Sequence, residues 1–211
     1  MQFPQQNIKR NAFILFDRLV YECIKGLWSG SSDSKISTLL SIQMSNEFFT
    51  PVSKDSWESL IREINDYGTI DGSVIKDHGR LEPLVYYFHC LNEVASGNYE
   101  NGFDVDHIIP QDSFNVPSIG DEEKALKNSL FNLELLPMEI NRKKKDNLYD
   151  DIWDRKLDAT EKNMCLISSS FSTAEDLCDF AKISKLSVFK EKRNAIINKA
   201  LEKRDENMNI H

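Results

Sequence analysis

Apolar residues recur every three or four positions along most of this chain, which is the spacing of a helix with one buried face. The pattern predicts helices over residues 12–28, 54–67 and 81–94. Glycine, serine and aspartate at 29–33 can end one helix and cap another over about 34–44. Loops are expected at Gly68, Gly72 and Gly79. Residues 1–97 are therefore expected to form a helical N-terminal lobe.

The pattern changes in the middle of the chain, over residues 98–147. Residues 103–108 alternate between apolar and polar positions and 133–136 are mostly apolar, so each segment predicts a short strand. The polar residues 110–128 between them contain proline and glycine and predict a long loop. Residues 138–147 predict a helix with an acidic residue near its start and lysines near its end, the order that the helix dipole favours.

Helical spacing returns in the last part of the chain. It predicts helices over 148–162, 173–181 and 187–203. The run Ser172–Thr173–Ala174–Glu175 has the form of a capping box for the second of these helices. Residues 148–211 are therefore expected to form a helical C-terminal lobe. The whole chain predicts a mainly α fold that holds a small strand–strand–helix core between two helical lobes.

Composition narrows the classes of protein that this chain can belong to. It has 211 residues, of which 40% are hydrophobic and 28% charged, as in ordinary soluble proteins. A net charge of −8 argues against a protein that coats nucleic acid. Residues 182–204 nevertheless carry eight basic residues against two acidic ones, which permits one basic face.

Location and redox state follow from what the sequence contains. No stretch approaches the ~20 apolar residues of a membrane span, and the first residues lack the pattern of a secretion signal. We therefore expect a cytoplasmic protein without a membrane partner. No Cys-x-x-Cys pair is present to clamp zinc, so the cysteines are expected to be reduced and buried. They are Cys23, Cys90, Cys165 and Cys178.

The most informative motif begins at the end of the first predicted strand. It reads Asp106–His107–Ile108–Ile109–Pro110–Gln111, and it is followed by Asn132, by Asn141 and by the basic run Arg142–Lys143–Lys144–Lys145. Successive side chains leave a strand on opposite sides, so a carboxylate at 106 and an imidazole at 107 can take separate tasks. Hydrolysis of a phosphodiester needs a positioned water, a general base and a cation over the phosphate. Histidine, with an unperturbed pKa of ~6.5, suits the role of the base.

The motif and its order of elements resemble the ββα-metal core of the HNH endonucleases. The match to the HNH domain of the RNA-guided CRISPR nucleases ends at about Asn147. A wider and less specific likeness is to the C-terminal half of GmrSD-type restriction proteins, where helices precede and follow the same core. No N-terminal nucleotide-sensing domain is recognisable, so the coupling of nucleotide hydrolysis to cleavage is not carried over.

The resemblance implies a role for each residue of the motif. Asp106 and Asn141 would bind one divalent cation, and His107 would be the general base. Asn132 would tie the loop or orient the imidazole. Contacts to DNA phosphates would come from Lys144 and its basic neighbours Arg142, Lys143 and Lys145. Because an asparagine stands at 141, all the ligands are oxygens, which favours Mg²⁺ or Mn²⁺ over zinc.

The resulting expectation is a metal-dependent DNA endonuclease whose products carry a 5′ phosphate, acting in prokaryotic restriction or antiphage defence. Two alternatives stay open: a non-cleaving DNA-binding or interaction module that needs a partner ATPase or sensor subunit, and an RNase on the same core. Individual residues also have purely structural interpretations. Asn132 can be a turn residue and 143–145 a solvated helix end. His78 is expected in a loop, His89 in a core helix, and Asp104 at the surface, although it could join the metal ligands.

Overall fold

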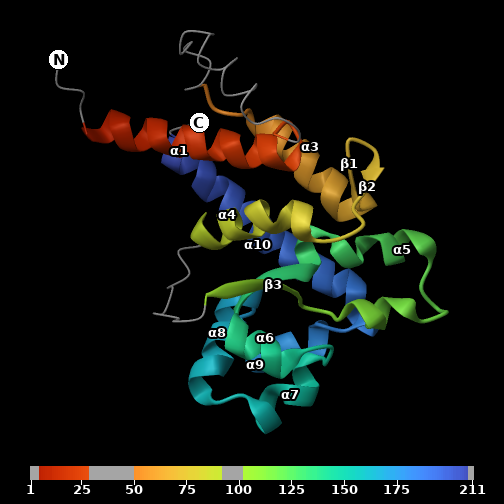
Figure 1. The fold of residues 1–211 in the computed structure, drawn as a ribbon. Helices are drawn as coiled ribbons and strands as arrows, with labels where there is room; N and C mark the ends of the chain where they lie inside the picture. Colours follow the sequence, from red (N-terminus) through yellow and green to blue (C-terminus); the bar gives the residue numbers. More distant parts are fainter. Residues whose placement is uncertain (1–4, 29–49, 92–101, 209–211) are drawn as a thin grey trace.

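The computed structural model describes residues 5–28, 50–91 and 102–208, and these are mostly helical, with two small antiparallel hairpins (Figure 1). The helix expected at 34–44 lies outside these residues. The N-terminal part consists of α1 (Gln5–Ile24), α3 (Lys54–Arg62) with the π-helical turn η2 (Glu63–Tyr67), the 3-10 turn η3 (Gly79–Leu81) and α4 (Glu82–Leu91). Trp57 and Leu60 of α3 and Leu84 of α4 are buried, as the helical spacing predicts.

The first hairpin falls where only loops were expected. β1 (Thr69–Ile70) and β2 (Ser73–Val74) pair beyond Gly68, whose φ of +63° ends η2. A Cβ on Gly68 would lie 2.5 Å from the carbonyl oxygen of Ala125, so the segment packs too closely there for any other residue. Two-residue strands give too short an alternation to be recognised in a sequence.

The second hairpin is the one that the sequence predicts. β3 (Phe103–His107) pairs antiparallel with β4 (Leu133–Pro137), so that Asp106 faces Glu134 across the ladder. The helix α6 (Met138–Lys144) follows β4 directly and packs against both strands. In Figure 1 the hairpin lies between α4 on one side and α6 on the other.

The segment between the two strands differs from the long loop that was expected. It contains η4 (Gln111–Asn115), α5 (Asp121–Ala125), η5 (Leu126–Asn128) and η6 (Leu130–Asn132). Phe114, Leu126 and Phe131 are buried in the main core, which holds these short turns in place although no long helical period marks them.

The C-terminal part also corrects one prediction. Residues 148–162 are not one helix but two, α7 (Tyr149–Lys156) and α8 (Ala159–Ser169). Leu157 is extended, and Asp158 caps α8 by accepting hydrogen bonds from the amides of Thr160 and Glu161. This capping box outweighs the continuous helical propensity of the segment. The chain ends with α9 (Ala174–Phe180), capped by Thr173, the turn η7 (Ile183–Lys185) and α10 (Leu186–Met208).

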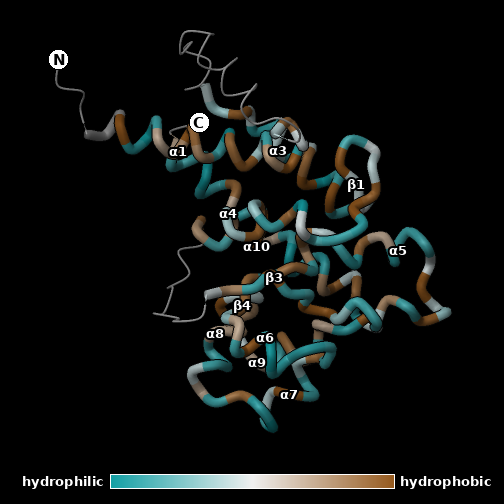
Figure 2. The backbone as a smooth tube through the Cα atoms, viewed as in Figure 1, coloured by the Kyte–Doolittle hydropathy of each residue, from teal (hydrophilic) through white to brown (hydrophobic). Residues whose placement is uncertain are grey.

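A single hydrophobic core runs through the whole molecule. α10 packs against α1 and α4 at one end and against η6 and α9 at the other, which joins the segments 1–97, 98–147 and 148–211. Figure 2 shows the hydrophobic and hydrophilic positions alternating along the helices that enclose this core. The division into three domains stays a prediction.

A buried ion pair crosses this core. Arg204 of α10 binds both carboxylate oxygens of Asp17 in α1, at 2.6 and 2.8 Å, and neither residue is exposed. Trp57 and Tyr87 donate to the same carboxylate from α3 and α4, at 3.2 and 2.7 Å. One carboxylate therefore ties four helices together.

Two expectations from composition can be compared with the structure. The four cysteines are free, but only Cys165 is fully buried, and Cys90 is exposed, which corrects the expectation that all are buried. Among the described helices, none is both long and apolar enough to span a membrane.

Candidate active site

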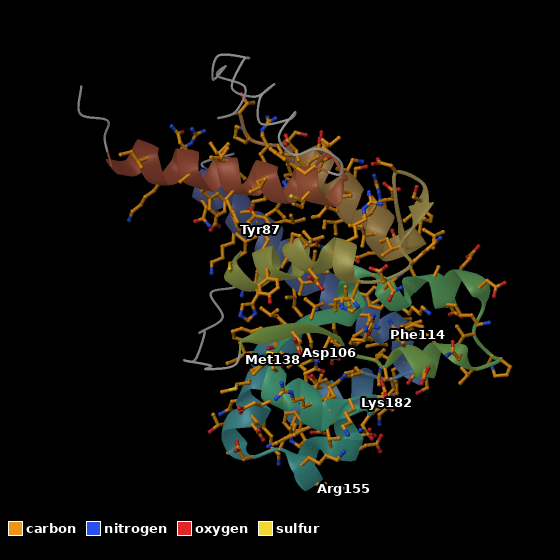
Figure 3. All side chains as sticks on the ribbon, in the orientation of Figure 1. Tyr87, Asp106, Phe114, Met138, Arg155 and Lys182 are labelled. Carbon is orange, nitrogen blue, oxygen red and sulfur yellow. The ribbon has the colours of Figure 1, made fainter. Side chains whose placement is uncertain are left out.

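The predicted motif lies at the end of β3, where its two neighbouring side chains face different elements. Asp106 is directed toward α6, and Figure 3 shows it in the middle of the molecule, between the N-terminal helices and α6. His107 is directed toward η4 and η5. The separation that the strand geometry predicts for these two side chains is therefore present.

Two acidic residues of β3 meet two polar residues of α6. Asn141 donates from Nδ2 to Asp104 Oδ2 at 3.0 Å, and Lys144 donates from Nζ to Asp106 Oδ2 at 2.6 Å. Residues two apart on a strand share a face, and residues three apart on a helix do as well, so the pairs lie side by side. Asp104 therefore belongs to this cluster and is partly buried, whereas the sequence favoured exposure.

Lys144 does not lie where a DNA phosphate would contact it. Its side chain is fully buried, and besides Asp106 it donates to the carbonyl oxygen of His107 at 2.5 Å. The ammonium group also lies 5.2 Å from the ring centre of Tyr149, which covers it from α7. The structure thus gives this lysine an internal role, and the phosphate contact expected at this position has no support here. The reason is that the side chain points between β3 and Tyr149 of α7, which sequence spacing does not reveal.

His107 is held by an asparagine that the sequence analysis did not single out. Its Nε2 lies 3.0 Å from Oδ1 of Asn128, and the Nδ2 of Asn128 donates to the carbonyls of Ile75 and Lys76 at 3.2 and 2.9 Å. An amide oxygen can only accept, so the proton of a neutral His107 ring is placed on Nε2. The lone pair is then left on Nδ1, as a general base requires.

Gln111 completes the support of this ring. Its Nε2 donates to Oδ1 of Asn128 at 3.1 Å and lies 3.0 Å from Nε2 of His107, so the two N–H groups converge on one oxygen. The ring of His78 lies edge-on to His107, with 5.3 Å between ring centres. Segments far apart in the sequence therefore fix the orientation of the imidazole.

Burial also sets the charge of His107. The residue is 8% exposed, and desolvation lowers the pKa of its ring below the ordinary value of 6.5. The hydrogen bond that the ring donates to Asn128 raises the pKa, and His78 and Lys144 lower it further. The ring is therefore neutral at physiological pH, which is the form that accepts a proton.

Asn132 is a structural tie. Its Oδ1 accepts from the amide of Ile109 at 2.8 Å, and its Nδ2 donates to the carbonyls of Ile109 and Lys127 at 3.0 and 2.9 Å. The residue is completely buried. Of the two tasks expected for Asn132, it performs the first, which is to tie the loop after the motif. The imidazole is held by Asn128 instead.

The other basic residues of the predicted DNA-binding run remain at the surface. Arg142, Lys143 and Lys145 are exposed. Lys143 is engaged with Glu161 of α8 at 2.5 Å, which raises the pKa of its ammonium group. Arg142 and Lys145 are thus the members of the run best placed for an external partner.

The donors between β3 and α6 fit a hard divalent cation. Asp104 and Asp106 offer oxygen, the atom that Mg²⁺ and Mn²⁺ prefer, whereas Asn141 now presents Nδ2 to Asp104 and would have to turn its Oδ1 toward the cation. Two carboxylates with one lysine leave a net negative charge for a cation to balance. In the part of the chain that the structure describes, no three His, Cys, Asp or Glu residues group as metal ligands, so any cation here depends on the amide oxygen of Asn141.

A buried acid lies behind this cluster. Glu134 of β4 is 1% exposed and pairs with Tyr149, while its Oε2 has no hydrogen-bond partner in the structure. Desolvation raises the pKa of its carboxyl group to about 7, although Lys144 opposes the shift. Arg193 of α10 holds the adjacent backbone by donating to the carbonyls of Phe131 and Leu133, each at 2.8 Å.

Three residues that support His107 were not assigned a role from the sequence: Gln111, Asn128 and His78. Gln111 stands inside the motif, so its position was a usable signal. Asn128 is one of two asparagines four residues apart, and the pattern gives no reason to choose between them. His78 precedes His107 by 29 residues and reaches it only through the fold. Comparison with known proteins adds no relative, because no family model, curated protein or solved structure matches this chain.

Proposed function

We propose that this protein is a divalent-metal-dependent endonuclease of the HNH type that hydrolyses phosphodiester bonds in DNA. The observation that carries the proposal is the orientation of His107, whose ring is fixed by Asn128 so that Nδ1 bears the lone pair. Its neighbour Asp106 faces a different side, toward Lys144 of α6. In the proposal, a base and a cation site lie side by side at the end of β3, which pairs with β4, and α6 follows β4, the order of elements in a ββα-metal core.

The proposed reaction uses His107 as the general base. Nδ1 takes a proton from a water molecule, and the oxygen of that water attacks phosphorus as the bond from phosphorus to the 3′ oxygen breaks. The 3′ oxygen leaves with its electron pair and receives a proton from solvent, so the products carry a 5′ phosphate and a 3′ hydroxyl. Asp106 and Asn141, with Asp104 beside them, would hold Mg²⁺ or Mn²⁺. When bound, the ion supplies positive charge to stabilise the phosphate and the leaving oxygen.

The resemblance to GmrSD-type restriction proteins extends this proposal to a biological setting. It suggests a cytoplasmic role in prokaryotic restriction or antiphage defence, together with a nucleotide-sensing or ATPase partner. Support for this part comes from the likeness of sequence alone, because fold and function are separable.

A second candidate function is a DNA-binding or interaction module that does not cut by itself. The observation that favours it is the ammonium group of Lys144, which already neutralises Asp106 at 2.6 Å. In such a module, binding of a partner would have to move α6 before a divalent cation could reach that carboxylate.

Nicking of supercoiled plasmid in the presence of Mg²⁺ tests the proposal. The wild-type protein should cut, chelation should stop the reaction, and His107→Ala should lower the rate at least 100-fold, within the range for loss of a general base. His89→Gln, on α4, is the matched histidine control and should cut normally. Single-stranded DNA, duplex DNA and RNA should be compared, and preferential cutting of RNA would replace DNA as the substrate. Cutting that ignores chelator or survives the loss of His107 would refute the mechanism.

A further inference from the structure

Two lysines outside the predicted basic run lie near His107 in the fold. Lys76 lies two residues before His78, whose ring contacts the His107 ring. Lys127 directly precedes Asn128, which accepts from the same ring. Lys76 is exposed and Lys127 is half-buried, so both reach the surface beside the candidate base.

The backbone of each lysine is fixed by an asparagine of the site. The carbonyl of Lys76 accepts from Asn128 and the carbonyl of Lys127 accepts from Asn132, each at 2.9 Å. The positions from which these side chains extend are therefore tied to the position of His107. Groups fixed in this way bind a ligand with a smaller loss of entropy than groups on a loose segment.

In the part of the chain that the structure describes, no acidic side chain neutralises these two lysines. Within the described residues, neither ammonium group forms an ion pair, whereas Lys143 is engaged with Glu161 and Lys144 with Asp106. Acidic residues close in sequence are directed elsewhere. Asp77 accepts from the amide of Gly79 at 3.0 Å, and Glu123 accepts from the amide of Gly120 at 3.1 Å.

We infer that Lys76 and Lys127 bind backbone phosphates of the nucleic acid next to the bond that is cut. This inference rests on the proposed function and places the main phosphate contacts around η5 and the segment before η3 rather than on α6. Lysine suits this task because its ammonium group is a flexible point charge that reads no base sequence.

Binding to a duplex oligonucleotide, measured without divalent metal over a range of salt concentrations, tests the inference. Each phosphate contact contributes about 0.9 to the slope of log affinity against log salt. The double variant Lys76→Gln/Lys127→Gln should therefore lower the magnitude of the slope by about 2 and raise the KM for cleavage about tenfold, with kcat within about threefold of wild type. Lys199→Gln, an exposed lysine on α10, is the matched control and should change neither quantity.

The outcomes separate this inference from the function on which it rests. An unchanged slope and KM in the double variant, with wild-type cleavage still dependent on His107, would overturn the inference alone. Failure of the wild-type protein both to bind and to cut would overturn both. The charge-preserving variant Lys76→Arg/Lys127→Arg should keep the wild-type slope. If it loses the slope while its thermal melting temperature is normal, charge is not the cause and the inference fails.

Discussion

At the scale of single residues, the orientation of His107 depends on Asn128. The amide oxygen accepts from Nε2 at 3.0 Å, and its amino group is held by two carbonyls, so the oxygen cannot turn away from the ring without losing both of those bonds. Outer hydrogen bonds of this kind fix which ring nitrogen reacts. The orientation of the proposed base is thus fixed by a residue that would not touch the substrate.

The first prediction concerns the pH dependence of cleavage. Only neutral His107 accepts a proton, and burial lowers its pKa, so kcat should rise with pH to a plateau through a pKa below 6.5. In Asn128→Ala, the plateau should fall about 10- to 100-fold, as for the loss of comparable outer hydrogen bonds. The rising limb should also move to lower pH, because the Asn128 hydrogen bond raises the pKa of the ring. A limb above pH 6.5, or an unchanged profile in the variant, would contradict this account.

Individual residues were predictable from the sequence to an uneven degree. Asp106 and His107 lie at the end of a strand and Asn141 on a helix, as predicted, but Asn141 pairs with Asp104 and Asp106 pairs with Lys144. The burial of Lys144 and the contact between His78 and His107 were not predictable, because both depend on which segments pack over the motif. The sequence also gives little information about the direction of a long, flexible side chain such as that of Lys144.

At the scale of elements, β4 differs from an ordinary hairpin strand because every one of its residues is buried, including an acid. Glu134 faces Asp106 across the ladder and contacts Tyr149 of α7. A carboxyl group buried with one unpartnered oxygen is costly when ionised. The free-energy cost of burying Glu134 in this hairpin therefore depends on pH.

The second prediction is that Glu134→Gln stabilises the protein at high pH. The folded state raises the pKa of Glu134 from 4.5 to about 7, so it binds the proton more tightly than the unfolded chain. Stability of the wild type should therefore be fully present below pH 4.5, fall as the pH rises toward 7, and change little above it from this group. Urea unfolding at pH 5 and pH 8 measures the effect. The gain of the variant over wild type should be larger at pH 8, and an equal or smaller gain there would exclude the explanation.

Elements with a long, regular period were predicted well, and short ones were not. The helices α4 and α10 and the strands β3 and β4 fall where the apolar spacing places them, with small differences at their ends, whereas α1 was predicted over 12–28 and spans Gln5–Ile24. Apolar spacing could not reveal the turns between β3 and β4, the β1–β2 hairpin or the break at Leu157, because each of these segments is too short to show a period. Their positions are decided by caps such as Asp158 and by burial of single residues such as Phe114.

At the scale of the whole molecule, residues 187 positions apart in the chain hold the two ends of the fold together. Asp17 in α1 and Arg204 in α10 form a buried ion pair to which Trp57 and Tyr87 also contribute hydrogen bonds. No periodicity reveals such a pair, because each residue resembles the solvated charges around it. The sequence showed an amphipathic helix at each end but not the contact between them.

The third prediction concerns this pair. Arg204→Leu should destabilise the protein by about 3–5 kcal/mol, since it leaves the carboxylate of Asp17 buried without a cation. Lys199→Leu, at an exposed position of the same helix, serves as the control. Its free energy of unfolding should change by no more than about 0.5 kcal/mol. The free energy of unfolding is obtained from urea titration. A loss below about 1 kcal/mol for Arg204→Leu would show that the pair contributes little to folding.

The proposed mechanism requires a divalent cation between β3 and α6, next to His107. Anomalous diffraction from a crystal soaked in Mn²⁺ locates such an ion directly. We predict one peak between the side chains of Asp106 and Asn141, with Lys144 displaced from the carboxylate oxygen that it now contacts or the ion bound through the other oxygen. The absence of a peak there at a saturating Mn²⁺ concentration, or a peak only at another place in the molecule, would contradict the account.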